Sequence, residues 1–177
     1  MKPTILALAV AFALIAGWTD WRWRRIPNWL TISGFVAGVA VNVVSSGLAG
    51  LKTSLLGAGL GLLLLLPLVF LRSLGAGDWK LAGALGAFVG PAVLADLLIG
   101  SIFVAGIMAL ALVIYKGRLR ETFRNIGHML AAMVSLRMPG EAVSLDNPQS
   151  LKVPYGVALA LTTVAFGALR VWTVRGK

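Results

Sequence analysis

Long apolar runs, interrupted by short groups of charged residues, glycine or proline, occupy most of the 177-residue chain. Divided at those interruptions, the runs predict six helical spans. They cover residues 3–19, 29–45, 50–71, 79–91, 92–115 and 153–173. The fourth run is short and rich in glycine, and at about 1.5 Å per residue it barely crosses a hydrocarbon core of about 30 Å. The pattern predicts an all-α, polytopic integral membrane protein with about six transmembrane helices.

Composition supports a membrane protein and removes several kinds of chemistry. Hydrophobic residues make up 59% of the chain and charged residues 12%, against roughly 25% charged residues in an ordinary soluble domain. The chain has no cysteine and one histidine, His128. These counts exclude disulfides, a thiol nucleophile and a site built from several histidines, so no metal or organic cofactor is expected.

The cations are unevenly distributed, and this predicts the orientation. Three polar segments, 20–28, 72–80 and 116–152, contain eleven of the 16 Lys and Arg residues. Because cationic loops remain in the cytoplasm, we expect these segments inside and both termini outside. The net charge of +10 is then explained by loops beside anionic headgroups, and no nucleic-acid partner is expected. The first run also fits a cleavable signal peptide, but the cationic stretch that follows it opposes export.

The longest polar segment and the glycine pairs predict two further features. Apolar residues recur at helical spacing from Leu119 to Met133, which predicts a helix on the cytoplasmic membrane surface, with His128 as a solvated residue. Residues 139–150 are expected to form a loop. The pairs Gly34/Gly38 and Gly86/Gly90 predict close helix packing within the chain, with a homodimer as the alternative.

Three carboxylates lie in or beside the predicted spans: Asp20, Asp78 and Asp96. An ionisable residue at membrane depth is costly and marks a functional site by default. Asp20 ends the first span and Asp78 begins the fourth, so both lie at the cytoplasmic end, whereas Asp96 falls toward the opposite face. Taken singly, Asp78 also fits a helix N-cap, and Asp20 a residue that balances nearby arginines.

Two carboxylates at one depth can share a proton, because like charges a few ångströms apart cannot both ionise cheaply. Such a pair is the machinery of an aspartyl protease, in which one carboxylate activates water and the other protonates the scissile carbonyl oxygen. Gly75 and Gly77 would let an extended, non-helical segment pair with the substrate backbone close to Asp78. The residues leave open which aspartate is the base.

Several motifs occur together in order. Gly75-Ala76-Gly77-Asp78 is preceded by Asp20 and by Ile26-Pro27-Asn28, and Pro154-Tyr155-Gly156 opens the last span. Over nearly the whole chain this arrangement resembles the type IV prepilin peptidases, which are GxGD membrane aspartyl proteases. It is most similar to the short CpaA/TadV-like members that serve tight-adherence (Tad/Flp) pilus systems.

The resemblance implies a single transmembrane peptidase domain over residues 1–177 in the inner (cytoplasmic) membrane. Its activity would remove the short basic leader of prepilins or pseudopilins at the cytoplasmic face, with Asp20 and Asp78 as the catalytic aspartates. The candidate substrate-binding residues are Gly75, Gly77, Lys80, Arg25, Pro27 and Asn28. The chain begins directly in a predicted span and lacks cysteine, so N-methylation, known in longer relatives, is not expected.

Two alternatives remain at this stage. One is a non-enzymatic membrane scaffold or transporter subunit, in which Asp20 and Asp78 are structural caps. A transporter should carry a carboxylate near the midplane, and none is evident. The other retains the protease chemistry but acts on preflagellin-like substrates. Arg22, Arg24 and Arg25 are expected to retain the loop in the cytoplasm, with contact to anionic lipid or to an acidic residue of the substrate as the alternative role.

Overall fold

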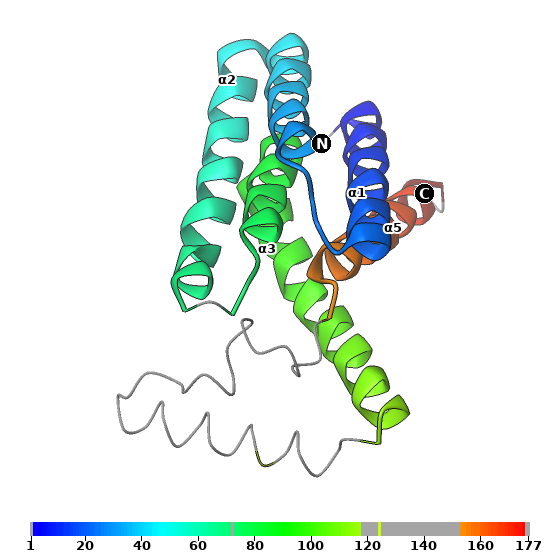
Figure 1. The fold of residues 1–177 in the computed structure, drawn as a ribbon. Coiled ribbons are helices and arrows are strands. Elements are labelled where there is room, and N and C mark those ends of the chain that lie inside the picture. The colour runs from blue at the N-terminus through cyan, green and yellow to red at the C-terminus, as the bar shows by residue number, and fades with distance from the viewer. Residues whose placement is uncertain (1, 72, 118–123, 125–152, 176–177) are drawn as a thin grey trace.

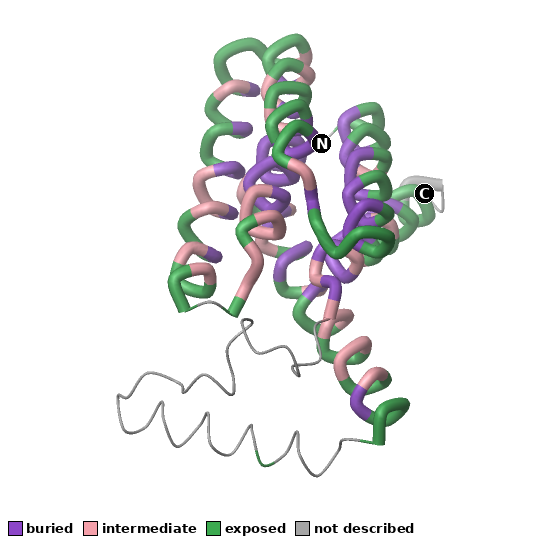
Figure 2. The backbone as a smooth tube through the Cα atoms, viewed as in Figure 1, coloured by how far each residue is buried: buried purple, intermediate pink, exposed green. Residues whose placement is uncertain are grey.

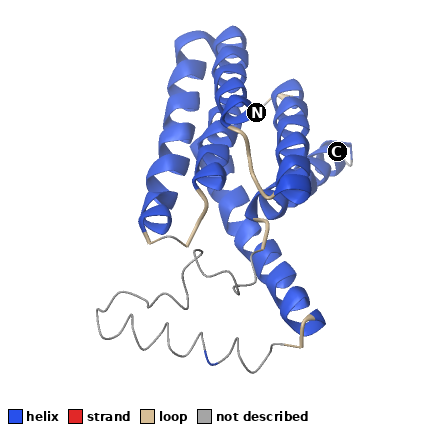
Figure 3. Cartoon of the chain, viewed as in Figure 1, coloured by secondary structure: helices blue, strands red, loops and turns tan. Residues whose placement is uncertain are grey.

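The computed structural model describes residues 2–71, 73–117, 124 and 153–175. These residues form helices and short connections, with no strand among them (Figure 3). The four helices are α1 (Pro3–Trp23), α2 (Asn28–Phe70), α3 (Ala76–Tyr115) and α5 (Tyr155–Arg175). All four contain stretches long and apolar enough to cross a membrane. The helical class and the presence of several helices that could cross a membrane confirm the prediction of an all-α, multi-pass membrane protein.

Helix α2 is too long for a single crossing and turns back on itself. Its 43 residues would extend about 64 Å if straight, roughly twice the thickness of a hydrocarbon core. Gly47 interrupts it with non-helical angles, φ 58° and ψ −136°. After this turn Gly50 packs directly against the carbonyl of Asn42, and the two arms run side by side (Figure 1). Glycine adopts this positive φ without the steric cost that a side chain would add.

Helix α3 turns in the same way at Gly90, where φ is 77° and ψ is 173°. A methyl group at Gly86 would lie 2.8 Å from the side chain of Leu94, although eight residues separate them by about 12 Å along a straight helix. The prediction of six separate segments is therefore not confirmed. Residues 2–117 and 153–175, as far as they are described, form four helices, and two of these are each bent at one glycine, because helical residues continue immediately on both sides of the turn.

The turn in α3 leaves backbone carbonyls that side chains of α2 satisfy. The carbonyl of Ala87 would normally accept from the N–H of residue 91, but Pro91 has none. Ser54 Oγ donates to this carbonyl at 2.7 Å and Asn42 Nδ2 donates at 2.9 Å. Asn42 Nδ2 also lies 2.9 Å from the carbonyl of Phe88. Both polar side chains are buried, and their hydrogen bonds join α2 to α3.

Small residues bring the helices close together inside the bundle. Gly57 and Gly86 place α2 and α3 in backbone contact, and Gly38 packs against the backbone of Ala87 and Phe88. Gly34 packs against the ring of Phe12. Gly90 packs against the Thr53 side chain and also forms a turn. All four glycines predicted to pack therefore make contacts within the chain, which gives the homodimer alternative no support. Exposed positions follow the outer sides of the helices (Figure 2). Many of these exposed residues have large apolar side chains, as a lipid environment requires.

The connections near the predicted cytoplasmic end are shorter than expected. Helix α1 continues through Trp23, so the expected loop 20–28 is helical at its start and a connection only from Arg24 to Pro27. Helix α3 begins at Ala76, within the expected loop 72–80. Helical hydrogen bonding therefore includes both aspartates. Most of segment 116–152, with the predicted surface helix, His128 and the loop at 139–150, lies outside the described residues.

Candidate active site

Asp20 lies on the buried face of α1. Ala9, Ala13 and Ala16 are fully buried, and their spacing of three and four residues places Asp20 on the same face. Asp20 is 6% exposed. The helix ends one turn later, at Trp23; the next residue, Arg24, adopts left-handed angles and its N–H donates to the Asp20 carbonyl at 2.9 Å. The carboxylate therefore lies at the end of a helix, facing the inside of the bundle.

Asp78 is fixed by the first turn of α3. Gly75 is the N-cap residue, so Asp78 is the third residue of the helix, and its carboxylate accepts from the backbone N–H of Gly75. An acidic side chain at this position satisfies an N–H that the helix leaves without an acceptor. The expectation of a non-helical segment over Gly75–Gly77 is wrong in part. Gly75 is extended, but Gly77 is helical.

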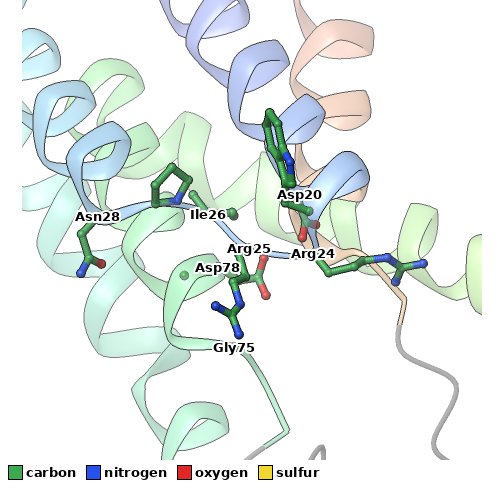
Figure 4. A pocket seen from close by; sticks show the side chains of 10 residues that line it. Asp20, Arg24, Arg25, Ile26, Asn28, Gly75 and Asp78 are labelled. Atoms are coloured by element: carbon green, nitrogen blue, oxygen red, sulfur yellow. The ribbon is translucent and has the colours of Figure 1, made fainter.

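The two carboxylates line one cavity although the whole of α2 separates them in the sequence. Both line a cavity of about 520 Å³ between the α1–α2 connection and the start of α3 (Figure 4). Its lining residues are Asp20, Trp23, Arg24, Arg25, Ile26, Pro27, Asn28, Gly75, Gly77 and Asp78. Asp20 and Asp78 are close enough to interact electrostatically, and so are Arg24 and Asp20.

One oxygen of each aspartate has no protein partner among the described residues. These buried oxygens are Oδ2 of Asp20 and Oδ1 of Asp78. Buried carboxylate oxygens are ordinarily hydrogen-bonded, and exceptions call for a functional explanation. A water molecule or a peptide carbonyl in the cavity could bond to both carboxylates, which is the arrangement that general acid–base hydrolysis requires.

Most of the residues predicted to bind substrate are brought to this cavity. Arg25, Pro27 and Asn28 line it, as do Gly75 and Gly77. Lys80 is not among the lining residues.

Lys80 instead contacts the cavity-lining residue Asn28, and its Nζ donates to Asn28 Oδ1 at 2.9 Å. Asp96 is exposed on the second arm of α3 and does not line the cavity. The structure thus separates Asp96 from the other two aspartates.

The sequence argument did not assign several residues that form the site. Trp23 and Ile26 line the cavity, although the sequence pattern gave Trp23 no role and Ile26 only a place in the Ile26-Pro27-Asn28 motif. Gly156, in the Pro154-Tyr155-Gly156 motif, lies against Asp20. A methyl group added at Gly156 would be 2.9 Å from Asp20 Oδ2. The motif signalled this position, but only the packing of α5 shows what it touches.

The described residues contain no group of three or more His, Cys, Asp or Glu side chains placed to hold a metal ion. Among the cavity-lining residues, the acidic side chains are Asp20 and Asp78, and the basic ones are Arg24 and Arg25.

Comparison with known proteins identifies the family of this chain. A profile of the Type IV leader peptidase family matches residues 7–111, which include Asp20, Asp78 and the whole cavity lining. The search of curated proteins and the search of solved structures found no match. Because the matched region covers more than half of the chain, this membrane protein belongs to the type IV leader peptidase family.

Proposed function

We propose that this protein is an aspartic endopeptidase that removes the basic leader peptide of Flp/Tad-type prepilins at the cytoplasmic face of the inner membrane. The observation that carries the proposal is the aspartate pair. Asp20 and Asp78 line one cavity, and each has one buried oxygen without a protein partner among the described residues. Family membership supports the peptidase activity and the class of substrate.

In the proposed reaction one carboxylate is ionised and its partner carries a proton. The ionised carboxylate accepts a proton from water as the water oxygen attacks the carbonyl carbon, and the partner donates its proton to the carbonyl oxygen. As the tetrahedral intermediate collapses, the C–N bond breaks and one hydroxyl of the intermediate returns its proton to the partner carboxylate. The leaving nitrogen receives a proton from the carboxylate that took one from water. The pair returns to a singly protonated state, so no metal or organic cofactor is needed.

The surroundings of the pair suit an extended peptide. Arg25 and Asn28 offer polar groups along one wall of the cavity, and Gly75 and Gly77 form part of the lining. Lys80 holds the Asn28 side chain oxygen, so its proposed role is to orient Asn28. A basic leader remains in the cytoplasm while the apolar segment after it enters the bilayer, so the scissile bond lies at the interface.

Co-expression with a candidate prepilin tests the proposal by the leader-sized shift of the substrate on a gel. Asp20→Asn and Asp78→Asn keep the side-chain volume but remove the carboxylate, so each should abolish cleavage. The matched control is Asp96→Asn, which alters an exposed aspartate away from the cavity and should cleave normally. Full cleavage by either of the first two variants contradicts the aspartate pair.

A scaffold or transporter subunit makes a different prediction in the same assay. Wild-type protein would then leave the prepilin uncut while the folded protein remained in the membrane. A panel that includes a preflagellin beside Flp-type prepilins separates the two protease alternatives, since the proposed enzyme should process the Flp-type substrate faster.

A further inference from the structure

A third element, the start of α5, reaches the aspartate pair. The backbone N–H groups of Gly156 and Val157 donate to the Asp20 carboxylate, and the N–H of Gly156 also interacts with Asp78. Both residues lie in the first turn of α5, where backbone N–H groups have no acceptor within the helix. The matched family region ends at residue 111, well before this helix begins.

Gly156 permits this approach because it has no side chain. A methyl group there would lie 2.9 Å from Asp20 Oδ2, 3.0 Å from Ile26 Cδ1 and 3.1 Å from Asp20 Cβ. All three atoms belong to residues that line the cavity. Any larger residue would therefore push α5 or the Asp20 side chain away from the present position.

A buried hydrogen bond anchors the start of α5 to the second arm of α3. The hydroxyl oxygens of Tyr155 and Ser101 are 2.7 Å apart, and Ser101 Oγ lies 2.8 Å from the carbonyl of Leu98. A serine hydroxyl has one proton. When Ser101 donates it to Leu98, Tyr155 must be the donor to Ser101. Ser101 is fully buried, so this bond holds the residue beside Gly156 against a rigid part of the bundle.

We propose that Gly156 is a positioning residue for the aspartate pair, with its backbone N–H and that of Val157 selecting which carboxylate oxygens react. This inference rests on the proposed function. An oxygen that accepts from a backbone N–H cannot present its own proton in that direction. The proton shared by the pair is therefore carried by Asp20 Oδ2 or Asp78 Oδ1, the two buried oxygens with no partner among the described residues.

The test is the full-length Gly156→Ala variant, assayed by leader cleavage with a purified prepilin. A shift of the carboxylate by a fraction of an ångström to 1 Å should lower kcat by about 10- to 100-fold. KM should change by less than about threefold, because the peptide-lining residues stay in place. The matched control is Gly167→Ala on the same helix. There a methyl group would lie 3.0 Å from Val10 Cγ2, an equally tight contact with α1, yet kcat should equal that of the wild type.

A folded Gly156→Ala protein with wild-type kcat overturns the inference, and so does an equal loss in Gly167→Ala. If Gly156→Ala does not fold, Tyr155→Phe decides. It removes only the hydroxyl that bonds Ser101 and should lower kcat about fivefold, whereas an unchanged kcat contradicts the inference. Inactive Asp20→Asn combined with fully active Gly156→Ala would reject the positioning role alone. Active Asp20→Asn would reject the proposed function itself.

Discussion

The hydrogen bonds that close the turn in α3 allow a quantitative prediction. Asn42→Ala removes two bonds to α3, one to the carbonyl of Ala87 and one to that of Phe88. Interhelical bonds of this kind contribute about 0.6 kcal/mol each in membrane proteins. In this variant the Ala87 carbonyl keeps its hydrogen bond from Ser54. The Phe88 carbonyl has no such replacement, because the non-helical Gly90 interrupts the helical hydrogen-bond pattern that would supply a backbone N–H. A buried carbonyl left unpaired adds about 1 kcal/mol, so the expected total loss is about 2 kcal/mol of unfolding free energy.

Ser54→Ala is the matched variant for this experiment. It removes one bond to the same Ala87 carbonyl, which Asn42 continues to satisfy, so its expected cost is about 0.6 kcal/mol. The double variant leaves that carbonyl unpaired. Its cost should therefore exceed the sum of the single costs by about 1 kcal/mol.

Reversible unfolding in mixed micelles of mild detergent and dodecyl sulfate measures these free energies through tryptophan fluorescence. Trp79 is a suitable reporter because its Nε1 donates to the carbonyl of Leu62 at 2.7 Å, across α3 and α2. Asn42→Leu restores side-chain volume without a donor and should lose as much stability as Asn42→Ala. The reasoning is refuted if Asn42→Ala costs no more than Ser54→Ala, or if Asn42→Leu is as stable as the wild type.

Two further predictions concern chemistry and orientation. Leader cleavage by purified protein should be unaffected by EDTA and by thiol reagents, because the chain has no cysteine and one histidine; a loss reversed by added metal would show this wrong. In this cysteine-free background, Ser73→Cys should react with an impermeant maleimide only from the cytoplasmic side and Ser46→Cys only from outside, since both positions are exposed and the cations gather near Ser73. Reversed labelling would refute the orientation.

Sequence periodicity was sufficient for the helical class and for most helix positions. Apolar runs of 20 residues or so form helices in a membrane because the backbone must satisfy its own hydrogen bonds there. Whether a glycine in such a run ends a helix or bends it cannot be derived locally. Gly47 and Gly90 allow α2 and α3 to turn back without an intervening loop, and at Gly90 the cost of the turn is offset by partners from α2, namely Asn42 and Ser54.

The choice of Asp20 and Asp78 as candidate catalytic residues also came from the sequence, because few carboxylates occur beside apolar runs and a motif surrounds Asp78. Their convergence was an expectation that depends on how α1 packs against α3. The contribution of Gly156 was decided by the tertiary structure alone. A backbone N–H has no sequence signature, and the proposed role of the Gly156 N–H depends on how closely α5 approaches Asp20. Such an approach is set by the packing of helices distant in the sequence, which local residue patterns do not encode.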